Sequence, residues 1–288
     1  MPPSPRLRRP AVASAKAGGP REHKKRFGQH FLEPAWVDKV LRTIAPQPYD
    51  TFLEIGPGRG ALTRALTASA RRVVAFEIDR DLASVLRETA PPNLTIEEGD
   101  FLSVTPDRIR SLLGDVTQVR VAGNLPYNIA SPILFKLTEL YGTGLPFADA
   151  TVMLQREVAD RLAAAPGTRD YGVLTVPIGR RAKVERVLAL PPGAFRPAPR
   201  VRSALVRLLF HPPNPLAMDE SVFAAMVQAV FTRRRKTLAN ALRAFPAPNR
   251  LSPAGALAKA GIDGIRRPET LRIEELVHLA DALVPESR

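Results

Sequence analysis

The chain has 288 residues, 45% of them hydrophobic, which is enough for one large core and a smaller second unit. No hydrophobic run approaches the roughly 18 residues of a membrane span, and residues 1–20 hold no apolar segment of the secretory type. The absence of cysteine excludes disulfides and thiolate chemistry, and agrees with a cytoplasmic location. The four histidines form no close pair and there is no Gly-x-Ser-x-Gly sequence, so neither a metal site nor a serine hydrolase is predicted.

The formal net charge of +14 is unevenly distributed. Residues 1–26 hold eight basic side chains and one acid, and residues 180–207 also hold eight against a single acid. Residues 50–149 are slightly acidic. A mildly acidic centre with basic flanks predicts a polyanion that touches the periphery of a site. General solubility is the alternative, and it explains the total charge better than it explains the clustering.

The predicted elements follow a regular order. Residues 1–23 read as a disordered basic tail, and Trp36 to Ile44 as a helix with its apolar residues on one face. Strands are then predicted at 51–56, 72–77, 94–97, 118–123, 150–154, 173–178, 183–188 and 201–209, with helices at about 60–69, 79–89, 106–113 and 130–141. This alternation predicts an α/β fold, Rossmann-like and doubly wound, with a mainly parallel sheet and an antiparallel pair at its edge.

A proline-rich stretch, His211 to Pro215, interrupts this pattern and is the predicted domain boundary. We therefore predict one domain over residues 24–211 and a small all-α domain over 212–288. Its helices are expected at about 219–231, 234–244, 252–260 and 270–284.

A glycine turn follows the first strand of the alternating part. Gly56, Gly58 and Gly60 stand on alternate positions between an apolar run and an amphipathic one, which predicts strand, tight turn and helix. Free N–H groups at such a helix start favour a polar or anionic ligand group. Glu77 ends the next apolar run, 21 residues after Gly56, where a nucleoside-binding unit carries the acid that binds ribose hydroxyls. Together these features predict a site for a nucleoside cofactor.

Two further polar signatures follow later strands. Asp100, after the strand at 94–97, is placed to accept a hydrogen bond from an exocyclic adenine amine; capping of the following turn is an equally good interpretation. Asn124-Leu-Pro-Tyr127 follows the strand at 118–123. The Asn124 side-chain oxygen and a neighbouring main-chain carbonyl can accept both hydrogens of a nucleobase amine, which aims its lone pair at an electrophile. Pro126 stiffens the turn, and Tyr127 offers a face for a flipped-out base.

With these motifs the sequence resembles class I S-adenosylmethionine-dependent methyltransferases that act on adenine amines. Four more segments are similar to the bacterial small-subunit ribosomal RNA adenine dimethyltransferases (the KsgA/RsmA family): Lys25–Leu32, Met153–Val158, Phe195–Ser203 and Phe231–Leu238. The similarity runs from about residue 24 to the C-terminal helices. It implies S-adenosylmethionine as cofactor and 16S ribosomal RNA in the immature small subunit as partner, with no membrane or metal, and a monomeric enzyme.

The resemblance also assigns roles by position. The positions matching the family's cofactor contacts are His30 (often Asn in the family), Leu32, Gly56, Glu77, Asp100 and Asn124. Those matching contacts to the target adenine are Asn124, Leu125 and Tyr127, with Phe195 closing the other face of the base. Pro197 and Pro199 favour an exposed, stiff loop around Phe195; packing in the core is the alternative. Arg233, Arg234, Arg235 and Lys236 would contact RNA phosphates, which position RNA without reading its sequence.

The implied reaction is direct methyl transfer to adenine N6, with no general base, repeated to give N6,N6-dimethyladenine on two adjacent adenosines of a small-subunit hairpin loop. Two alternatives remain open: a dimethyltransferase of large-subunit (23S) RNA, which looks similar around the glycine turn and the Asn-x-Pro-Tyr motif, and a ribosome-assembly factor that mainly binds immature subunits.

Overall fold

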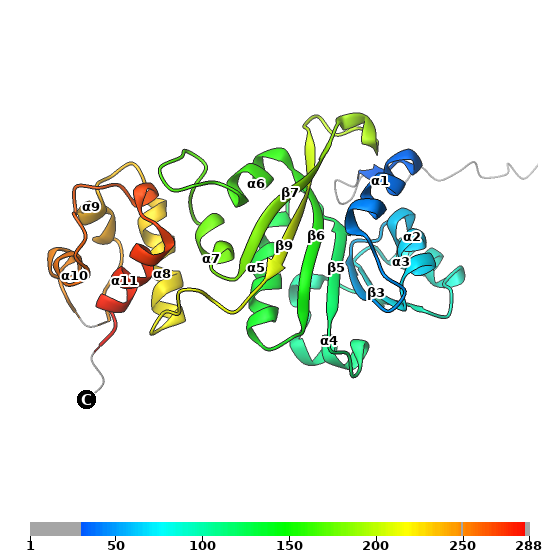
Figure 1. Cartoon of the computed structure of the whole chain (residues 1–288), viewed down its shortest axis with the longest axis horizontal. Coiled ribbons are helices and arrows are strands. Elements are labelled where there is room, and N and C mark those ends of the chain that lie inside the picture. The colour runs from blue at the N-terminus through cyan, green and yellow to red at the C-terminus, as the bar shows by residue number, and fades with distance from the viewer. Residues whose placement is uncertain (1–29, 249, 286–288) are drawn as a thin grey trace, which may run out of the picture.

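A computed structural model describes residues 30–248 and 250–285 of the chain (Figure 1). The predicted tail over 1–23 and the basic segment over 24–29 lie outside the described residues. The chain forms two structural units in succession, first a sheet covered by helices and then a group of helices (Figure 1). An irregular segment between β9 (Ser203–Phe210) and α8 (Glu220–Thr232) links them (Figure 1).

The main sheet has seven strands in the order β4-β3-β2-β5-β6-β9-β7. Four neighbouring pairs are parallel, and β9 pairs antiparallel with both β6 and β7 at one side of the sheet. The strands are β2 Thr51–Ile55, β3 Arg72–Glu77, β4 Leu94–Glu98, β5 Val119–Asn124, β6 Phe147–Gln155, β7 Ala182–Leu190 and β9 Ser203–Phe210. The predicted Rossmann-like sheet with an antiparallel edge is confirmed.

A second, very small sheet pairs β1 (Phe31–Leu32) antiparallel with β8 (Phe195–Arg196). Leu32 lies opposite Phe195 in this pairing. It brings the start of the described chain against a segment more than 160 residues later.

Five helices precede or connect strands β2 to β6, and two of them begin at side-chain caps. They are α1 Pro34–Ile44, α2 Ala61–Ser69, α3 Arg80–Glu88, α4 Pro106–Leu113 and α5 Ala130–Gly142. The Asp79 side chain accepts from the N–H groups of residues 81 and 82 at the start of α3, and Thr105 caps α4 in front of a proline at its first position. Parallel neighbours need such crossovers, so the helices are placed on the two faces of the sheet.

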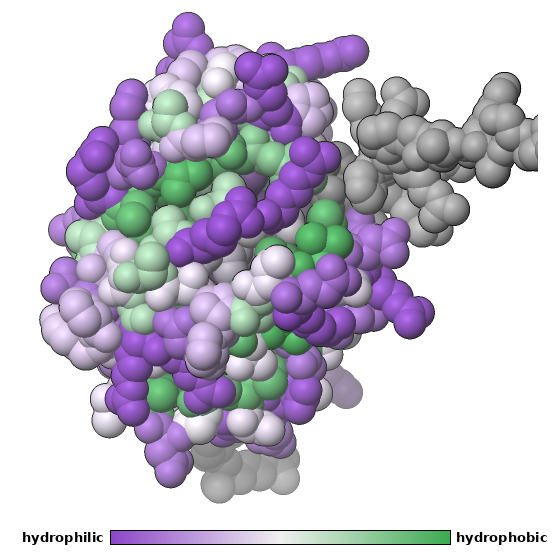
Figure 2. All heavy atoms as spheres, turned by 90° about the vertical axis from the view of Figure 1, so that its right-hand side faces the viewer, coloured by the Kyte–Doolittle hydropathy of each residue, from purple (hydrophilic) through white to green (hydrophobic). Residues whose placement is uncertain are grey.

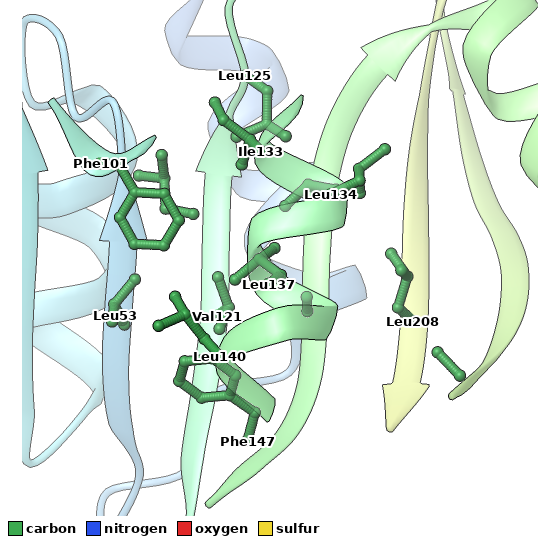
Figure 3. Close-up of a cluster of buried hydrophobic side chains, with 14 of the residues drawn as sticks. Leu53, Phe101, Val121, Leu125, Ile133, Leu134, Leu137, Leu140, Phe147 and Leu208 are labelled. Atoms are coloured by element: carbon green, nitrogen blue, oxygen red, sulfur yellow. The ribbon is translucent and has the colours of Figure 1, made fainter. Parts of the chain in front are cut away.

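Neighbouring residues on β2 point into different cores. Leu53 packs with Val121, Leu137 and Phe147 beneath α5 (Figure 3), whereas Phe52 packs on the opposite face with residues of α1 and α2. This is the alternation of side chains expected along a strand. Because both faces are covered, β2 is buried along its whole length and its carboxyl end is held firmly where the glycine turn begins.

One strand prediction is wrong. Residues 173–178 do not form a strand; Thr175–Gly179 form a short helix, α7, after α6 (Arg156–Leu162). A short apolar run does not distinguish a buried strand from a buried helix. Pro177 has no N–H for a strand ladder, and the helix instead places Val176 and Ile178 into two different cores.

The C-terminal helices are α8 Glu220–Thr232, α9 Leu238–Leu242, α10 Pro253–Ala260 and α11 Ile273–Ala282. They enclose a core of their own that includes Phe223, Met226, Leu242 and Leu276. The helix predicted over 234–244 is shorter than expected, because residues 233–236 form the turn between α8 and α9.

The exposed surface has the mixed hydrophilic and hydrophobic character of a globular chain. On the side of α1, α2 and α3, hydrophilic side chains predominate and hydrophobic residues are exposed in separate areas between them (Figure 2). Within the described residues, no helix has the length and apolar character that crossing a membrane requires.

Candidate functional site

The glycine turn joins β2 to α2 and needs its glycines. Gly56, Gly58 and Gly60 have φ angles of 69°, 58° and 76°, a region that other residues rarely adopt. A Cβ atom on Gly58 would lie 3.1 Å from the ring of Phe31. The turn therefore keeps its main chain uncovered beside β1, at the carboxyl end of the sheet.

Glu77 ends the neighbouring strand, β3, and its carboxylate is held in place. Oε2 accepts a hydrogen bond from the Gly58 N–H (2.8 Å), and Oε1 accepts one from the Asp79 N–H (2.9 Å). The residue is only 2% exposed, and this burial raises the pKa of its carboxyl group. Glu77 thus ties the glycine turn to the next strand and presents a fixed acceptor beside it.

Asp100 follows β4, and the capping interpretation of its sequence position is confirmed, whereas its contact with an adenine amine stays a prediction. Its Oδ1 accepts from the Leu102 N–H at 2.9 Å and so caps the short 3₁₀ helix η1 (Phe101–Ser103). The same residue also lines the cavity beside the glycine turn. Capping orients this exposed carboxylate and does not remove it from the site.

Asn124, at the end of β5, has its amide group oriented by the chain before β2. Its Nδ2 donates to the main-chain oxygen of His30 over 2.6 Å. With the N–H side engaged in this bond, the Oδ1 atom is the part of the amide left to accept hydrogen from a ligand.

His30 and Tyr127 lie against one another. Their ring centroids are 5.5 Å apart with planes inclined by 28°, and His30 Nδ1–H donates to the Pro197 carbonyl at 2.6 Å. Tyr127 Oη lies 2.5 Å from Ser203 Oγ, and burial raises the pKa of the hydroxyl, so Tyr127 is uncharged near neutral pH. The His30 ring therefore covers one face of the Tyr127 ring, and a planar base could stack on that face only in its place.

These side chains line one cavity. The predicted site residues found there are His30, Leu32, Gly56, Glu77, Asp100, Asn124, Leu125 and Tyr127. They come from the ends of four parallel strands and from β1, which is the place where open α/β sheets bind ligands.

Phe195 is different. It is not among the residues that line the cavity; it is 1% exposed and packs behind β1 in the core with Leu32, Leu190 and Leu205. The expected exposed loop begins only after it. The ring is buried because β8 pairs with β1 and turns it toward the core.

Sequence reasoning missed Glu54. It is the last residue but one of β2, is 1% exposed and lines the cavity. Burial raises its pKa to about 8, and Oε2 is buried without a hydrogen-bond partner among the described residues. The available signal was an acid within an otherwise apolar strand, since such a residue is rarely buried without a partner.

Two other cavity residues were also missed in this role. Phe31 was not predicted to line the site, yet its ring lies beside the turn, and the Arg59 guanidinium carbon lies over the ring at 4.4 Å from its centroid. Arg59 is the exposed member of the glycine turn, and it places a positive charge at the cavity wall.

The basic residues after α8 gather round one hollow. Arg233, Arg234, Arg235 and Lys236 line it together with Thr232, Asn240 and Arg243. Because 233–236 form a turn, their side chains are not restricted to the faces of a helix. Arg243 was not predicted; it lies seven or more residues after the others and joins them only through the fold.

The basic segment 180–207 is largely neutralised within the protein. Its ion pairs are Arg180 and Arg181 with Glu220, Lys183 with Glu185, Arg186 with Asp160, Arg196 with Glu33 and Arg207 with Asp149. Arg200 and Arg202 are exposed. Six of the eight basic side chains in this segment thus have acidic partners within the protein, and the excess positive charge that the segment can offer a polyanion is smaller than its sequence alone suggests.

Comparisons with known proteins agree with this geometry. The model of the family "Ribosomal RNA adenine dimethylase" matches residues 21–280. A curated protein of Pseudomonas fluorescens, named Ribosomal RNA small subunit methyltransferase A, is 41% identical over 92% of this chain and 95% of its own. A protein of the same name from Acinetobacter baylyi is 42% identical over 91% of this chain and 93% of its own.

Two solved structures have the same fold. A dimethyladenosine transferase from Plasmodium falciparum aligns with a TM-score of 0.67 and 25% identity over 87% of this chain and 96% of that one. The 23S rRNA methyltransferase ErmE aligns with a TM-score of 0.60 and 29% identity over 88% of this chain and 99% of that one. Family model, relatives and fold all agree, and the chain belongs to the ribosomal RNA adenine dimethylase family.

Proposed function

We propose that this protein transfers methyl groups from S-adenosylmethionine to the N6 atoms of two adjacent adenosines in the 3′-terminal hairpin loop of 16S ribosomal RNA. The observation that carries the proposal is the oriented amide of Asn124 at a cavity that also holds Glu77 and the glycine turn. The relatives at 41–42% identity, which are named as small-subunit methyltransferases, support the choice of RNA.

The residues of the cavity fit the cofactor. Glu77 would accept hydrogen bonds from the ribose hydroxyls, and Asp100 one from the adenine amine, while Gly56 and Leu32 leave room for the nucleoside. Glu54 Oε2, which is buried without a partner among the described residues, suits an N–H or O–H donor. When bound, S-adenosylmethionine supplies a methyl group on a positively charged sulfur. We assign His30 to the cofactor side through its position at the cavity wall.

The remaining residues would hold the target base. Asn124 Oδ1 and the Leu125 carbonyl would accept the two N6 hydrogens and so aim the nitrogen lone pair at the methyl group. Tyr127 would stack on the base, which requires the His30 ring to move aside from that face. Orientation of the two reactants would supply much of the rate. The attacking N6 amine would gain the positive charge that the sulfur loses, become acidic and lose its proton to water, so no side chain is assigned as general base.

After the first transfer only one N6 hydrogen remains, so a dimethylating pocket must tolerate the loss of one acceptor contact. The apolar Leu125 and the Tyr127 ring would accommodate the added methyl group. Phe195 is not placed to do so in this conformation, because it is buried behind β1.

We propose two domains, residues 24–211 for catalysis and 212–288 for RNA binding through the turn after α8. The enzyme would work as a monomer on immature small subunits in the cytoplasm. The likeness to ErmE keeps a 23S target as the second candidate, and a mainly RNA-binding assembly role as the third.

Mass analysis tests the proposal directly. Immature small subunits treated exhaustively with purified enzyme and cofactor should yield N6,N6-dimethyladenosine at two neighbouring positions of the 3′-terminal loop. A product limited to monomethyladenosine would contradict the dimethylation. Modification of large-subunit RNA instead would establish the second candidate, and tight binding without methyl transfer would establish the third.

A further inference from the structure

Arg180 is a fully buried cation at the junction between the sheet and the C-terminal helices. It lies between α7 and β7, is 1% exposed, and forms a two-pronged contact with Glu220: Nη1 to Oε2 at 3.0 Å and Nη2 to Oε1 at 2.8 Å. Glu220 is the first residue of α8. The pair therefore joins the end of one structural unit to the beginning of the other.

The same guanidinium also holds the linker. Its Nε and Nη2 donate to the Pro215 carbonyl at 3.1 and 2.8 Å, and its plane lies 4.2 Å from the centroid of the Phe223 ring on α8. The main-chain oxygen of Arg180 accepts from the Asn214 N–H at 2.9 Å. A planar fork with several donors suits this arrangement, which a lysine would not reproduce.

Hydrophobic packing also connects the two structural units at this junction. Val176 of α7 packs in the core of the C-terminal helices, whereas Ile178, two residues later, packs in the core of the sheet. The helix just before Arg180 is thus part of both cores, and the two units meet through packed contacts rather than through the linker alone.

The far end of α8 carries the basic turn. The helix has 13 residues between Glu220 and Thr232, a rigid span of about 20 Å, and Arg233–Lys236 follow at once. A contact that fixes the first turn of α8 therefore also fixes the place of these cations relative to the sheet, whose carboxyl edge forms the cavity.

We propose that Arg180 is a positioning residue for the RNA. It holds the basic turn at a set distance and direction from the cavity, so that one RNA engages both at once. This rests on the proposed function, because it assumes that the cavity takes a base and the turn takes phosphates of the same RNA. Two linked contacts of one ligand gain affinity only when their geometry permits simultaneous binding.

The test uses Arg180→Met and two substrates, unmodified small subunits and a short hairpin RNA that carries only the target loop. Methionine fills the buried site without an unpaired cation, and Glu220, 44% exposed as a side chain, stays solvated. On subunits we expect KM to rise about tenfold with kcat nearly unchanged. On the short hairpin, which does not reach both sites, kcat/KM should equal that of the wild type.

Arg266→Met is the matched control, since Arg266 pairs with Glu275 inside the C-terminal unit alone. It should lower stability without a selective change in KM for subunits. Glu220→Gln gives a second variant if Arg180→Met folds poorly, and it should reproduce the selective rise in KM. A wild-type KM on subunits, or an equal loss on both substrates, would overturn the inference. Wild-type enzyme that methylates neither substrate would instead refute the proposed function, and the inference with it.

Discussion

Asn124 reaches across the cavity to the main-chain oxygen of His30, which lies 94 residues earlier in the chain, and donates its side-chain N–H over 2.6 Å. An amide without such a partner could rotate and offer its N–H group to the ligand. The bond thus decides which side of Asn124 faces a target amine.

Replacing Asn124 by alanine tests this orientation. Asn124→Ala should lower kcat by about 10²-fold or more, because the target nitrogen is no longer oriented, while RNA binding stays near wild type. Single-turnover methylation and filter binding measure the two effects. Gln47→Ala, which removes an exposed side-chain amide that does not line the cavity, is the control and should keep the wild-type kcat. A wild-type kcat in folded Asn124→Ala would contradict the role given to the amide.

Glu77→Ala should weaken the binding of S-adenosylmethionine by about 1.5–3 kcal/mol, the usual loss for a hydrogen bond to a charged group. Titration calorimetry on the purified variant measures the change, with circular dichroism to confirm that the protein is folded. Asp81→Ala removes an exposed acid from the next helix and should leave the affinity unchanged. Wild-type affinity in folded Glu77→Ala would refute the ribose contact.

The buried Glu54 should make stability depend on pH. Its pKa is about 8 in the folded protein against an ordinary value of 4.5, so between these values only the unfolded chain releases the proton. Its contribution to stability is fully present below about pH 4.5 and is lost as pH rises toward 8, a total of roughly 5 kcal/mol.

Glu54→Gln should therefore flatten the fall of unfolding free energy with pH, and urea denaturation between about pH 5 and pH 8 measures it. Glu88→Gln, at an exposed acid on α3, is the comparison and should leave the slope of unfolding free energy against pH nearly unchanged. If the Glu54→Gln slope matched the wild type, the carboxyl group would not be held protonated by burial.

Tyr127 and Phe195 should respond differently to truncation. Tyr127→Ala should weaken binding of RNA carrying the target adenosine by about 1–3 kcal/mol, the range for a lost stacking contact. Tyr127→Phe keeps the ring and loses only the contact with Ser203, so it should bind nearly normally. Comparing target RNA with RNA lacking the two adenosines isolates the base contact; equal losses on both would argue against stacking.

Phe195→Ala should instead act on the fold, because the ring is 1% exposed within a packed core. We expect the free energy of unfolding to fall by about 3–5 kcal/mol, as for other buried phenylalanines. Denaturation in urea with and without cofactor measures it. A fully stable variant with weakened RNA binding would restore the base-contacting role that the sequence predicted.

Neutralising Arg233, Arg234 and Lys236 should weaken RNA binding and flatten its dependence on salt, by about 0.7–0.9 in slope for each lost phosphate contact. Binding measured over a series of salt concentrations gives the slope. Neutralising Arg87, Arg108 and Arg110, which pair with surface acids near α3 and α4, is the control of equal charge change. Equal slopes for the two triple variants would mean that net charge alone matters.

The sequence predicted the part of the site that depends on strand ends. Gly56, Glu77, Asp100 and Asn124 each follow an apolar run, and parallel strands bring their carboxyl ends together whatever the details of packing. Glu54 was not predicted as a site residue, because its role depends on what surrounds it in the folded sheet. Phe195 lies away from the cavity because the pairing of β8 with β1 turns its ring inward, and packing in the core was the alternative that its sequence position left open.

Local sequence pattern was also a poor guide where tertiary contacts determine the secondary structure or the charge of a segment. Residues 173–178 are rich in β-branched side chains, yet Val176 and Ile178 gain more by packing into separate cores from a helix. Likewise the excess positive charge of 180–207 is smaller than the sequence suggests, because the fold supplies Glu220, Asp160 and Asp149 as partners. Neither the acids nor their distance is visible in the local sequence.

The small sheet of β1 and β8 has a consequence for the order of folding. The pairing of Leu32 with Phe195 closes a loop of more than 160 residues, and loops of that length form late because their closure is costly in entropy. During synthesis, β1 leaves the ribosome long before its partner exists, whereas β2, β3 and β4 can already pair with one another. The wall that carries His30 and Leu32 can therefore close only after β8 has been made, and a nascent chain has its parallel strands before it has a closed cavity.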